Sequence, residues 1–167
     1  MNRIAYLALG SNLPSPYGSP QKTLRMAVNR LEDLGGLTAL SSLYETDPAG
    51  RHDQPVFFNA VAALECEFTP QALLQRMLAL EGEFGRIRDA NAPKGPRTLD
   101  LDLLLMGDLV VRTGGLTLPH PALAQRRFVL TPLAEIAPQL QHPILHRSIA
   151  ELLAALPDEG ENRIAAV

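Results

Sequence analysis

The sequence predicts an α+β fold, with a ferredoxin-like βαββαβ core followed by a C-terminal extension made of a hairpin and short helices. Two observations support this prediction. Apolar, β-prone runs occupy residues 4–9, 37–44, 58–67 and 99–106, and apolar residues at helical spacing follow the first and the third run. Strands and helices therefore do not alternate strictly, which argues against a doubly wound parallel sheet.

Both predicted core helices have clear start and stop signals. Each begins with an N-cap residue followed by proline, at Ser19-Pro20 and at Thr69-Pro70. Glycines end them, at Gly35 and at Gly85. The polar, proline- and glycine-containing segments 45–57 and 86–97 are predicted to be loops.

The extension contains shorter elements. Two short apolar pieces flank Thr113-Gly114-Gly115 and predict a hairpin over residues 109–118. Thr131-Pro132 predicts a helix start, and Ser148 with Glu151 forms a capping box before another helix. We expect a single domain over residues 1–167, with a core at about 3–107, the extension at about 108–156 and a frayed tail at 157–167.

Composition excludes several classes of protein. Charged residues make up 20% of the 167 residues and hydrophobic residues 46%, so the chain is not disordered. A net charge of −3 argues against nucleic acid and anionic membrane as partners. The single cysteine, Cys66, cannot form an internal disulfide, and neither a signal peptide nor a membrane-spanning run is present. We expect a cytoplasmic monomer that acts on small molecules.

The most informative segment runs from Gly95 to Leu104 and contains Asp100 and Asp102. Alternate side chains of a strand point to opposite faces, so Leu99, Leu101, Leu103 and Leu105 enter the core while the two carboxylates share the other face. Neighbouring carboxylates repel unless a cation or a proton neutralises them. Mg²⁺ accepts such short oxygen ligands and completes its shell with water and phosphates. The pair predicts a Mg²⁺–nucleotide site; the alternative is the polar face of an edge strand.

The loop before this pair favours the phosphate interpretation. Arg86, Arg88, Lys94 and Arg97 against Asp89 give a local charge of +4 − 1 = +3. Guanidinium groups bind phosphate oxygens in a bidentate manner, so such a loop can hold a polyphosphate. The alternative is a solvated, arginine-rich loop. A P-loop is excluded because its glycine-lysine motif is absent.

Two further segments carry candidate ligand contacts. Downstream, His120 lies between prolines, and Arg126, Arg127 and Phe128 follow it; the alternatives are a free loop histidine and a surface arginine pair. Upstream, Phe57 and Phe58 stand where a loop enters a strand. They face opposite sides if extended, so one enters the core and the other can stack on a flat ligand.

At these residues the sequence resembles the 6-hydroxymethyl-7,8-dihydropterin pyrophosphokinase family, from near residue 4 to about residue 140. The matching blocks, in order along the chain, are Ala8–Leu13, Tyr44–Pro48, Asp53–Pro55 with Phe58–Ala60, Gly85–Arg88, Gly95–Asp102 and Leu118–His120. The resemblance implies a ferredoxin-like fold, transfer of pyrophosphate from ATP to the pterin hydroxymethyl group, and release of AMP. Two positions depart from the family pattern: residues 88–95 contain no aromatic side chain, and Phe57 stands where many members have tyrosine.

The resemblance also implies residue roles. Asp100 and Asp102 would bind two Mg²⁺ ions, with ATP as co-substrate. The implied catalytic residues are Arg86, Arg97, Asp100 and Asp102. The implied nucleotide-binding residues are Glu81, Arg88, Arg97, His120 and Arg126. The implied pterin-binding residues are Thr46, Pro48, Ala49, Phe57, Asn59 and Phe128.

Two other functions are weighed against this one. A non-enzymatic ferredoxin-like ligand-binding module explains the fold but not a carboxylate pair beside an arginine-rich loop. A two-metal nucleotidyl transferase of the polymerase-palm or cyclase type would use similar carboxylates. The net charge of −3, without a broad basic stripe, argues against a nucleic-acid substrate.

Overall fold

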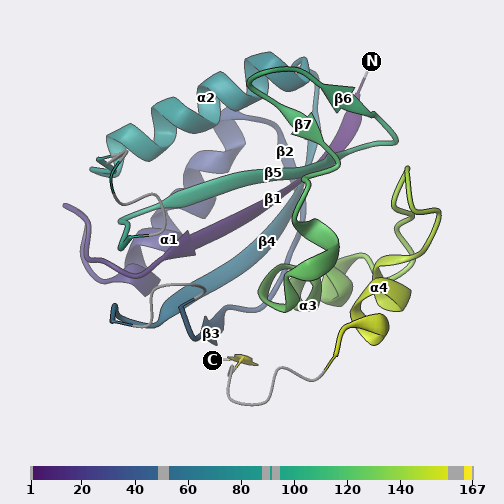
Figure 1. Cartoon of the computed structure of the whole chain (residues 1–167). Helices are drawn as coiled ribbons and strands as arrows, with labels where there is room; N and C mark the ends of the chain where they lie inside the picture. Colours follow the sequence, from purple (N-terminus) through teal and green to yellow (C-terminus); the bar gives the residue numbers. More distant parts are fainter. Residues whose placement is uncertain (1, 49–52, 88–90, 92–94, 158–163, 167) are drawn as a thin grey trace.

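The computed structural model describes residues 2–48, 53–87, 91, 95–157 and 164–166 (Figure 1). The strands are β1 (Arg3–Ser11), β2 (Gly36–Leu40), β3 (Tyr44–Thr46), β4 (Phe57–Cys66), β5 (Asp100–Met106), β6 (Val111–Arg112), β7 (Thr117–Leu118) and β8 (Ile164–Ala166). The α-helices are α1 (Pro20–Arg30), α2 (Pro70–Glu83), α3 (Arg127–Ile136) and α4 (Ile149–Ala155), and short 3₁₀ helices cover Leu31–Asp33 and Leu123–Gln125. Within the described residues, none of these helices combines the length and the apolar character needed to span a bilayer.

One antiparallel sheet of six strands organises the core. Its order is β5-β1-β4-β3-β8, and β2 pairs with β4 beside β3. The start of β4 pairs with β3 and its later part with β2, so these two short strands share the position of the second core strand. The spatial order is then fourth, first, third and second core strand, and the predicted ferredoxin-like α+β fold is confirmed.

The predicted caps form as expected. The Ser19 hydroxyl accepts a hydrogen bond from the Lys22 amide, and the Thr69 hydroxyl accepts one from the Ala72 amide. Ser148 and Glu151 form the reciprocal capping box at α4. Beyond the end of α2, Gly85 has a φ of +82°, a conformation that a residue with a Cβ rarely adopts. That turn lets the Arg86 amide bond back to the Glu81 carbonyl and directs Arg86 toward the sheet.

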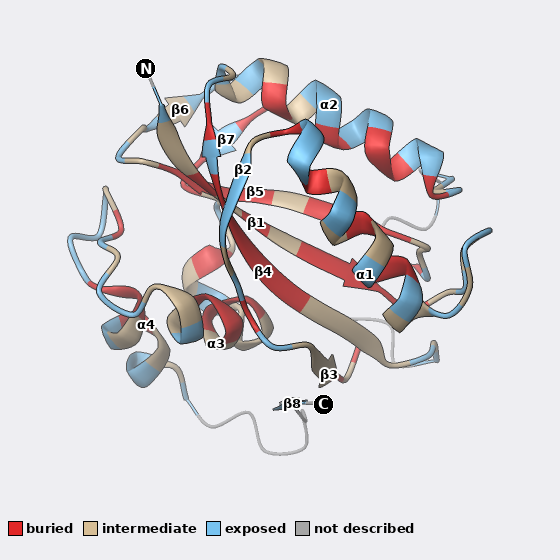
Figure 2. Cartoon of the chain, turned by 180° about the vertical axis from the view of Figure 1, so that it is seen from behind, coloured by how far each residue is buried: buried red, intermediate tan, exposed pale blue. Residues whose placement is uncertain are grey.

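Two hydrophobic clusters lie on opposite faces of the sheet. Helices α1 and α2 cover one face and bury the larger cluster, which includes Leu24, Leu73 and Leu101 (Figure 2). Helices α3 and α4 cover only part of the other face and bury the second cluster around Leu130 and Leu152. The rest of that second face, at the starts of β4 and β5, remains for polar side chains.

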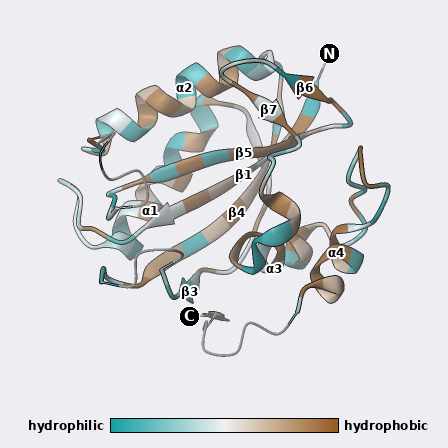
Figure 3. Cartoon of the chain, viewed as in Figure 1, coloured by the Kyte–Doolittle hydropathy of each residue, from teal (hydrophilic) through white to brown (hydrophobic). Residues whose placement is uncertain are grey.

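A β-bulge corrects the prediction that Leu105 joins the same core as Leu99, Leu101 and Leu103. Leu7 pairs with Leu103 whereas Tyr6 pairs with Leu105, so β5 has one extra residue, Leu104. Leu104 and Leu105 both belong to the second cluster, under α3 and α4. Figure 3 shows that hydrophilic and hydrophobic residues alternate at the start of β5 and that a continuous hydrophobic stretch, which contains the bulge, follows.

Three boundary predictions are also wrong. Helix α3 begins at Arg127 and contains Pro132 in its interior, so Thr131-Pro132 does not start it. The run 37–44 forms two strands, and β3 extends into the predicted loop 45–57. Within the predicted frayed tail, Ile164–Ala166 pair with β3 as strand β8. Each correction reflects tertiary contacts that override a local signal.

Candidate active site

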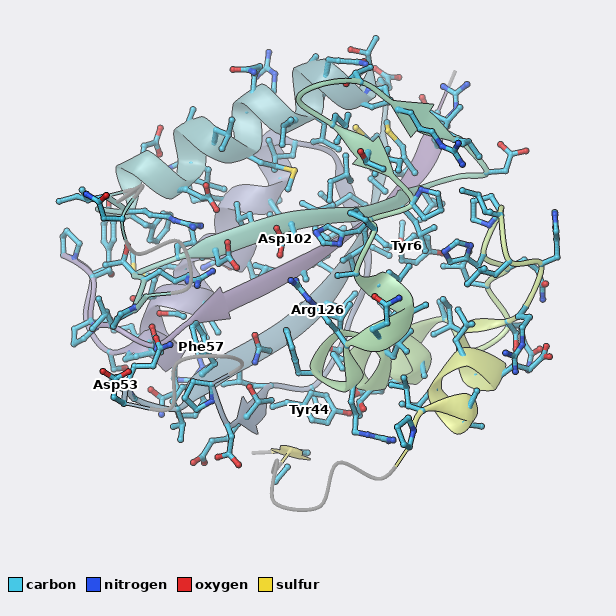
Figure 4. All side chains as sticks on the ribbon, viewed as in Figure 1. Tyr6, Tyr44, Asp53, Phe57, Asp102 and Arg126 are labelled. Atoms are coloured by element: carbon cyan, nitrogen blue, oxygen red, sulfur yellow. The ribbon has the colours of Figure 1, made fainter. Side chains whose placement is uncertain are left out.

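The polar part of the second sheet face collects predicted residues from three strands and from the extension. Asp100 and Asp102 lie on β5, opposite Gly10 and Ala8 of β1. Strand β4 contributes Phe57 and Asn59, strand β3 contributes Thr46, and the extension contributes His120, Arg126 and Phe128. In Figure 4, Arg126 reaches over the sheet face that carries Asp102 and Phe57. The site therefore joins residues separated by more than 80 positions in the sequence.

Asp100 is held by two arginines. Its Oδ1 accepts a hydrogen bond from Arg86 Nη1 at 2.6 Å, and its Oδ2 accepts one from Arg97 Nη1 at 3.2 Å. The Arg86 side chain is only 9% exposed, so water screens this ion pair weakly. Arg97 also donates from Nε to the Gly95 carbonyl at 3.1 Å. The two guanidinium groups are thus fixed next to the carboxylate pair, as the phosphate interpretation requires.

Asp102 differs from its neighbour in its electrostatic environment. Burial and, to a smaller extent, the Asp100 charge raise the pKa of Asp102 from 3.8 to about 6, against the opposing effect of the Arg126 charge. A raised pKa means that the ionised carboxylate is short of stabilising partners in this position. An added cation next to Asp102 would supply the missing stabilisation.

His120 is oriented by its own turn. Its backbone amide donates to the Leu104 carbonyl at 2.9 Å, and its Nδ1 accepts a hydrogen bond from the Ala122 amide at 3.1 Å. Burial lowers the pKa of His120, and the Arg126 charge lowers it as well. The ring is therefore neutral at pH 7 with its proton on Nε2, from which it can donate to an anion.

The predicted pterin-binding residues form a second group on the same face. Asn59 Nδ2 donates to Thr46 Oγ1 at 2.6 Å, which orients both side chains. A Cβ on Gly10 would lie 2.9 Å from Asn59 Oδ1, so glycine is required for this amide to lie across β1. The Phe57 ring lies 5.4 Å from Arg97 Cζ, and the Phe128 ring lies 5.7 Å from Arg126 Cζ. Each predicted stacking ring is thus adjacent to a predicted phosphate-binding arginine.

The expectation that Phe57 and Phe58 face opposite sides of the strand agrees with the structure. Phe58 packs against the larger hydrophobic cluster, while Phe57 lies on the opposite face with Asn59 as its neighbour two residues along. Pro48 is buried just after β3. Ala49 and Arg88, predicted to bind pterin and nucleotide respectively, lie outside the described residues.

Glu81 has a different environment from the one expected of a nucleotide contact. It is 2% exposed, and its Oε2 accepts hydrogen bonds from Arg86 Nη1 at 2.7 Å and from the Leu101 amide at 2.8 Å. Arg86 therefore lies between Glu81 and Asp100. Arg127 is likewise not part of the site, because its guanidinium donates to the Leu156 and Pro157 carbonyls.

Asn12 is a functional candidate that the sequence alone does not single out. Asn12 is 2% exposed at the end of β1, and its side chain bonds to both loops that border the site. The only sequence signal was its position in the Gly10-Ser11-Asn12 block, where a polar residue directly follows a buried strand. Such a position is also typical of an ordinary turn, so its role depends on the tertiary structure.

The carboxylate pair fits magnesium better than a metal that needs many protein ligands. Within the described ranges, no three His, Cys, Asp or Glu side chains are grouped as a metal cluster. Mg²⁺ is commonly bound by one or two carboxylates and completes its octahedron with water and substrate phosphates. The raised pKa of Asp102 supplies a structural reason for a cation at this position.

Comparisons with known proteins point to one family. A family model described as 7,8-dihydro-6-hydroxymethylpterin-pyrophosphokinase matches residues 6–138. A 2-amino-4-hydroxy-6-hydroxymethyldihydropteridine pyrophosphokinase of Pseudomonas aeruginosa is 47% identical over 159 residues, which cover 95% of each chain. A protein of the same description from Bacillus subtilis is 43% identical over 143 residues, covering 84% of this chain and 82% of that relative.

A solved structure supports the fold independently. The HPPK-DHPS structure of Plasmodium falciparum superposes with a TM-score of 0.72 at 15% sequence identity. The match covers 92% of this chain and 44% of that chain, so the present chain spans less than half of it.

Proposed function

The chain belongs to the 7,8-dihydro-6-hydroxymethylpterin-pyrophosphokinase family, and on this premise we propose how its sheet face carries out the reaction. The activity is a transferase activity of folate biosynthesis: pyrophosphate moves from ATP to the hydroxymethyl group of the dihydropterin. The pterin oxygen forms a bond to the β-phosphorus of ATP, the bond between that phosphorus and the α–β bridging oxygen breaks, and AMP leaves. The hydroxyl proton is released to water in the same transfer.

In this proposal Asp100 and Asp102 bind Mg²⁺, and two ions are used. The metal supplies Lewis-acid stabilisation of the polyphosphate when it is bound. Asp100 also polarises the attacking hydroxyl group. The shared face of the two carboxylates on β5 supports these roles, as does the raised pKa of Asp102.

The phosphate chain is bound by arginines and one histidine in this proposal. Arg86 and Arg97 already lie at hydrogen-bond distance from Asp100, so they neutralise charge beside the metal ligands. His120 donates Nε2–H, and Arg126 faces the same region because its charge affects Asp102 and His120. Arg88 belongs to the same proposed group. Catalysis is then mainly positioning and charge stabilisation, since phosphoryl transfer needs little covalent help from the protein.

The pterin is bound at the other end of the site. Phe57 and Phe128 stack on its two faces, and Asn59, Thr46, Pro48 and Ala49 recognise its hydrogen-bonding edge. The Asn59–Thr46 hydrogen bond supports this assignment because it fixes which amide atoms remain for a ligand. Glu81 acts as a positioning residue for Arg86 rather than as a nucleotide contact, since it is buried and bonds to Arg86 Nη1.

One observation carries the proposal: two buried or half-buried arginines bond to the carboxylate that lies beside Asp102 on one face of β5. The test is incubation with ATP, Mg²⁺ and the pterin alcohol, with separation of the nucleotides. AMP should appear in equal amounts with the pterin pyrophosphate. ADP would identify an ordinary kinase, and absence of both would favour the ligand-binding module.

Action as a monomer in the cytoplasm, within a single domain, belongs to the same proposal. The sedimentation behaviour of the purified chain at several concentrations tests the monomeric state. A polymerase-like or cyclase-like activity would instead release pyrophosphate from ATP without any pterin present.

A further inference from the structure

Asn12 connects three separate parts of the chain at the edge of the proposed site. Its backbone amide donates to the Arg97 carbonyl at 3.1 Å, and its side-chain Oδ1 accepts from the Arg97 amide at 2.8 Å. Its Nδ2 donates to Gln54 Oε1 at 2.9 Å and to the Pro55 carbonyl at 3.0 Å. The Leu13 amide adds a bond to the same Arg97 carbonyl at 3.2 Å.

The chemistry of this position requires an amide side chain. One end of the side chain must accept a hydrogen bond and the other must donate two, which aspartate cannot do because both of its oxygens are acceptors. Asn12 is 2% exposed, so water cannot replace a lost partner without opening the structure. The two ends point to different loops: the acceptor to the residues before β5 and the donor to the residues before β4.

The two connected loops serve different substrates in the proposed function. Arg97 belongs to the proposed phosphate end of the site, while Gln54 and Pro55 lie three and two residues before Phe57 at the proposed pterin end. The Arg97 guanidinium lies 5.4 Å from the Phe57 ring, so the two ends meet beside Asn12. In-line transfer requires the pterin oxygen and the β-phosphorus to be placed accurately relative to each other.

We propose that Asn12 is a positioning residue that fixes the phosphate-binding loop relative to the pterin-binding loop and thereby couples the binding of the two substrates. This inference rests on the proposed function. Four hydrogen bonds join Asn12 to Arg97 on the phosphate side and to Gln54 and Pro55 on the pterin side. Because each loop can still bind its own ligand, the effect of Asn12 appears mainly when both substrates are present.

The decisive variant is Asn12→Asp. The aspartate still accepts from the Arg97 amide, but its second oxygen faces two acceptors, Gln54 Oε1 and the Pro55 carbonyl. Gln54 can turn its amide and donate from Nε2 to the new carboxylate, but the Pro55 carbonyl can only accept. The variant therefore loses the bond to Pro55, which loosens the pterin-side loop, and keeps the bond on the phosphate side. Ser11→Ala is the matched control, because Ser11 is equally buried and its hydroxyl bonds only to the Leu13 carbonyl among the described contacts.

The measurement is calorimetric titration with a non-hydrolysable ATP analogue and the pterin alcohol, each alone and each in the presence of the other. In the wild-type chain we expect each ligand to tighten the binding of the other. The coupling is the ratio of the Kd of one ligand alone to its Kd in the presence of the other. In Asn12→Asp this ratio should fall at least tenfold, while the Kd of the ATP analogue alone changes less than threefold. The kcat should fall on the order of 10²-fold, as for a misplacement of about 1 Å. Ser11→Ala should retain both the coupling and the kcat.

Several outcomes would overturn the inference. Wild-type coupling and kcat in Asn12→Asp would do so, and so would an equal loss in Ser11→Ala. If Asn12→Asp fails to fold, Gln54→Ala replaces it: this variant removes one of the two pterin-side acceptors and should give a smaller loss of coupling, and an unchanged coupling would refute the role. A wild-type chain that forms no AMP disproves the proposed function itself, whereas normal AMP formation with unaltered Asn12→Asp disproves only this inference.

Discussion

Neutralising Asp102 should stabilise the metal-free protein and at the same time abolish its activity. Burial and the charge of Asp100 raise the pKa of Asp102 from 3.8 to about 6. One pKa unit corresponds to about 1.4 kcal/mol, so the ionised side chain costs the folded state up to about 3 kcal/mol at neutral pH. In Asp102→Asn the charge is removed but a buried amide remains, so we expect a gain of about 1–2 kcal/mol. The Tm should rise by about 2–8 °C.

The neighbouring carboxylate is the matched control, and its replacement should have the opposite effect. Asp100→Asn weakens the bonds to Arg86 and Arg97, and the Arg86 side chain is only 9% exposed. The expected cost is about 1–3 kcal/mol of unfolding free energy. Thermal and urea unfolding, followed by circular dichroism in the presence of EDTA, gives the Tm and the free energy of unfolding of the wild type and of both variants. Neither variant should retain more than a trace of AMP formation.

The pH dependence of stability checks whether the charge of Asp102 destabilises the folded protein. Since the pKa of Asp102 is raised in the folded state, folded protein binds this proton more readily than unfolded chain. The free-energy cost of the ionised Asp102 is therefore fully present above about pH 6 and is relieved as the pH falls from about 6 to about 4. The Tm difference between Asp102→Asn and wild type should shrink over that range and be small near pH 4. A variant less stable than wild type at pH 7.5, or a difference independent of pH, would refute the electrostatic reasoning.

Three further predictions follow, two for the site and one for the contact between β3 and α3. Arg86→Ala should lower kcat more than it raises the KM for ATP, if its phosphate contact forms mainly in the transition state; steady-state kinetics showing an unchanged kcat with a raised KM would contradict that role. Gly10→Ala should displace the Asn59 amide, because the new Cβ would lie 2.9 Å from its Oδ1, and should raise the KM for the pterin about three- to tenfold while the KM for ATP stays constant. Burial and a hydrogen bond to Glu135 raise the pKa of Tyr44 to about 12. Glu135→Gln should lower this pKa in a spectrophotometric titration, with Tyr44→Phe as the reference that identifies the Tyr44 signal. An unchanged pKa would show that burial alone causes the shift.

Local signals in the sequence were sufficient for the core helices and for the carboxylate pair. The Ser19-Pro20 and Thr69-Pro70 caps depend only on neighbouring residues, and the alternation of Asp100 and Asp102 with leucines depends only on strand geometry. The same cap rule failed at Thr131-Pro132, where α3 continues through the proline. There Val129 and Leu130 are buried in the second cluster, and their burial outweighs the hydrogen bond that Pro132 cannot make.

Other features depend on contacts between distant residues and leave no local signal. The bulge lies in the run Leu103–Leu105, and nothing in three successive leucines shows that one of them is an extra residue. The pairing of β8 with β3 joins residues about 120 positions apart. For the proposed site, residue types predicted a phosphate end, but only the fold revealed that Glu81 is buried behind Arg86 and that Asn12 joins two loops.

The extra leucine in β5 also has a consequence for insertions and deletions in this strand. Upstream of Leu104, the strand carries Asp100 and Asp102, which would bind the metal. Leu104 itself holds the segment that bears His120, because its carbonyl accepts a hydrogen bond from the His120 amide. Deleting Leu104 would remove the bulge and leave Leu105 and Met106 opposite Tyr6 and Ala5, but it would take away the carbonyl that accepts the His120 amide. The turn that bears His120 would then lose its hydrogen bond to β5, while Asp100 and Asp102 kept their pairing with β1. A single deleted codon would thus separate the histidine from the acids without changing any residue proposed to bind substrate.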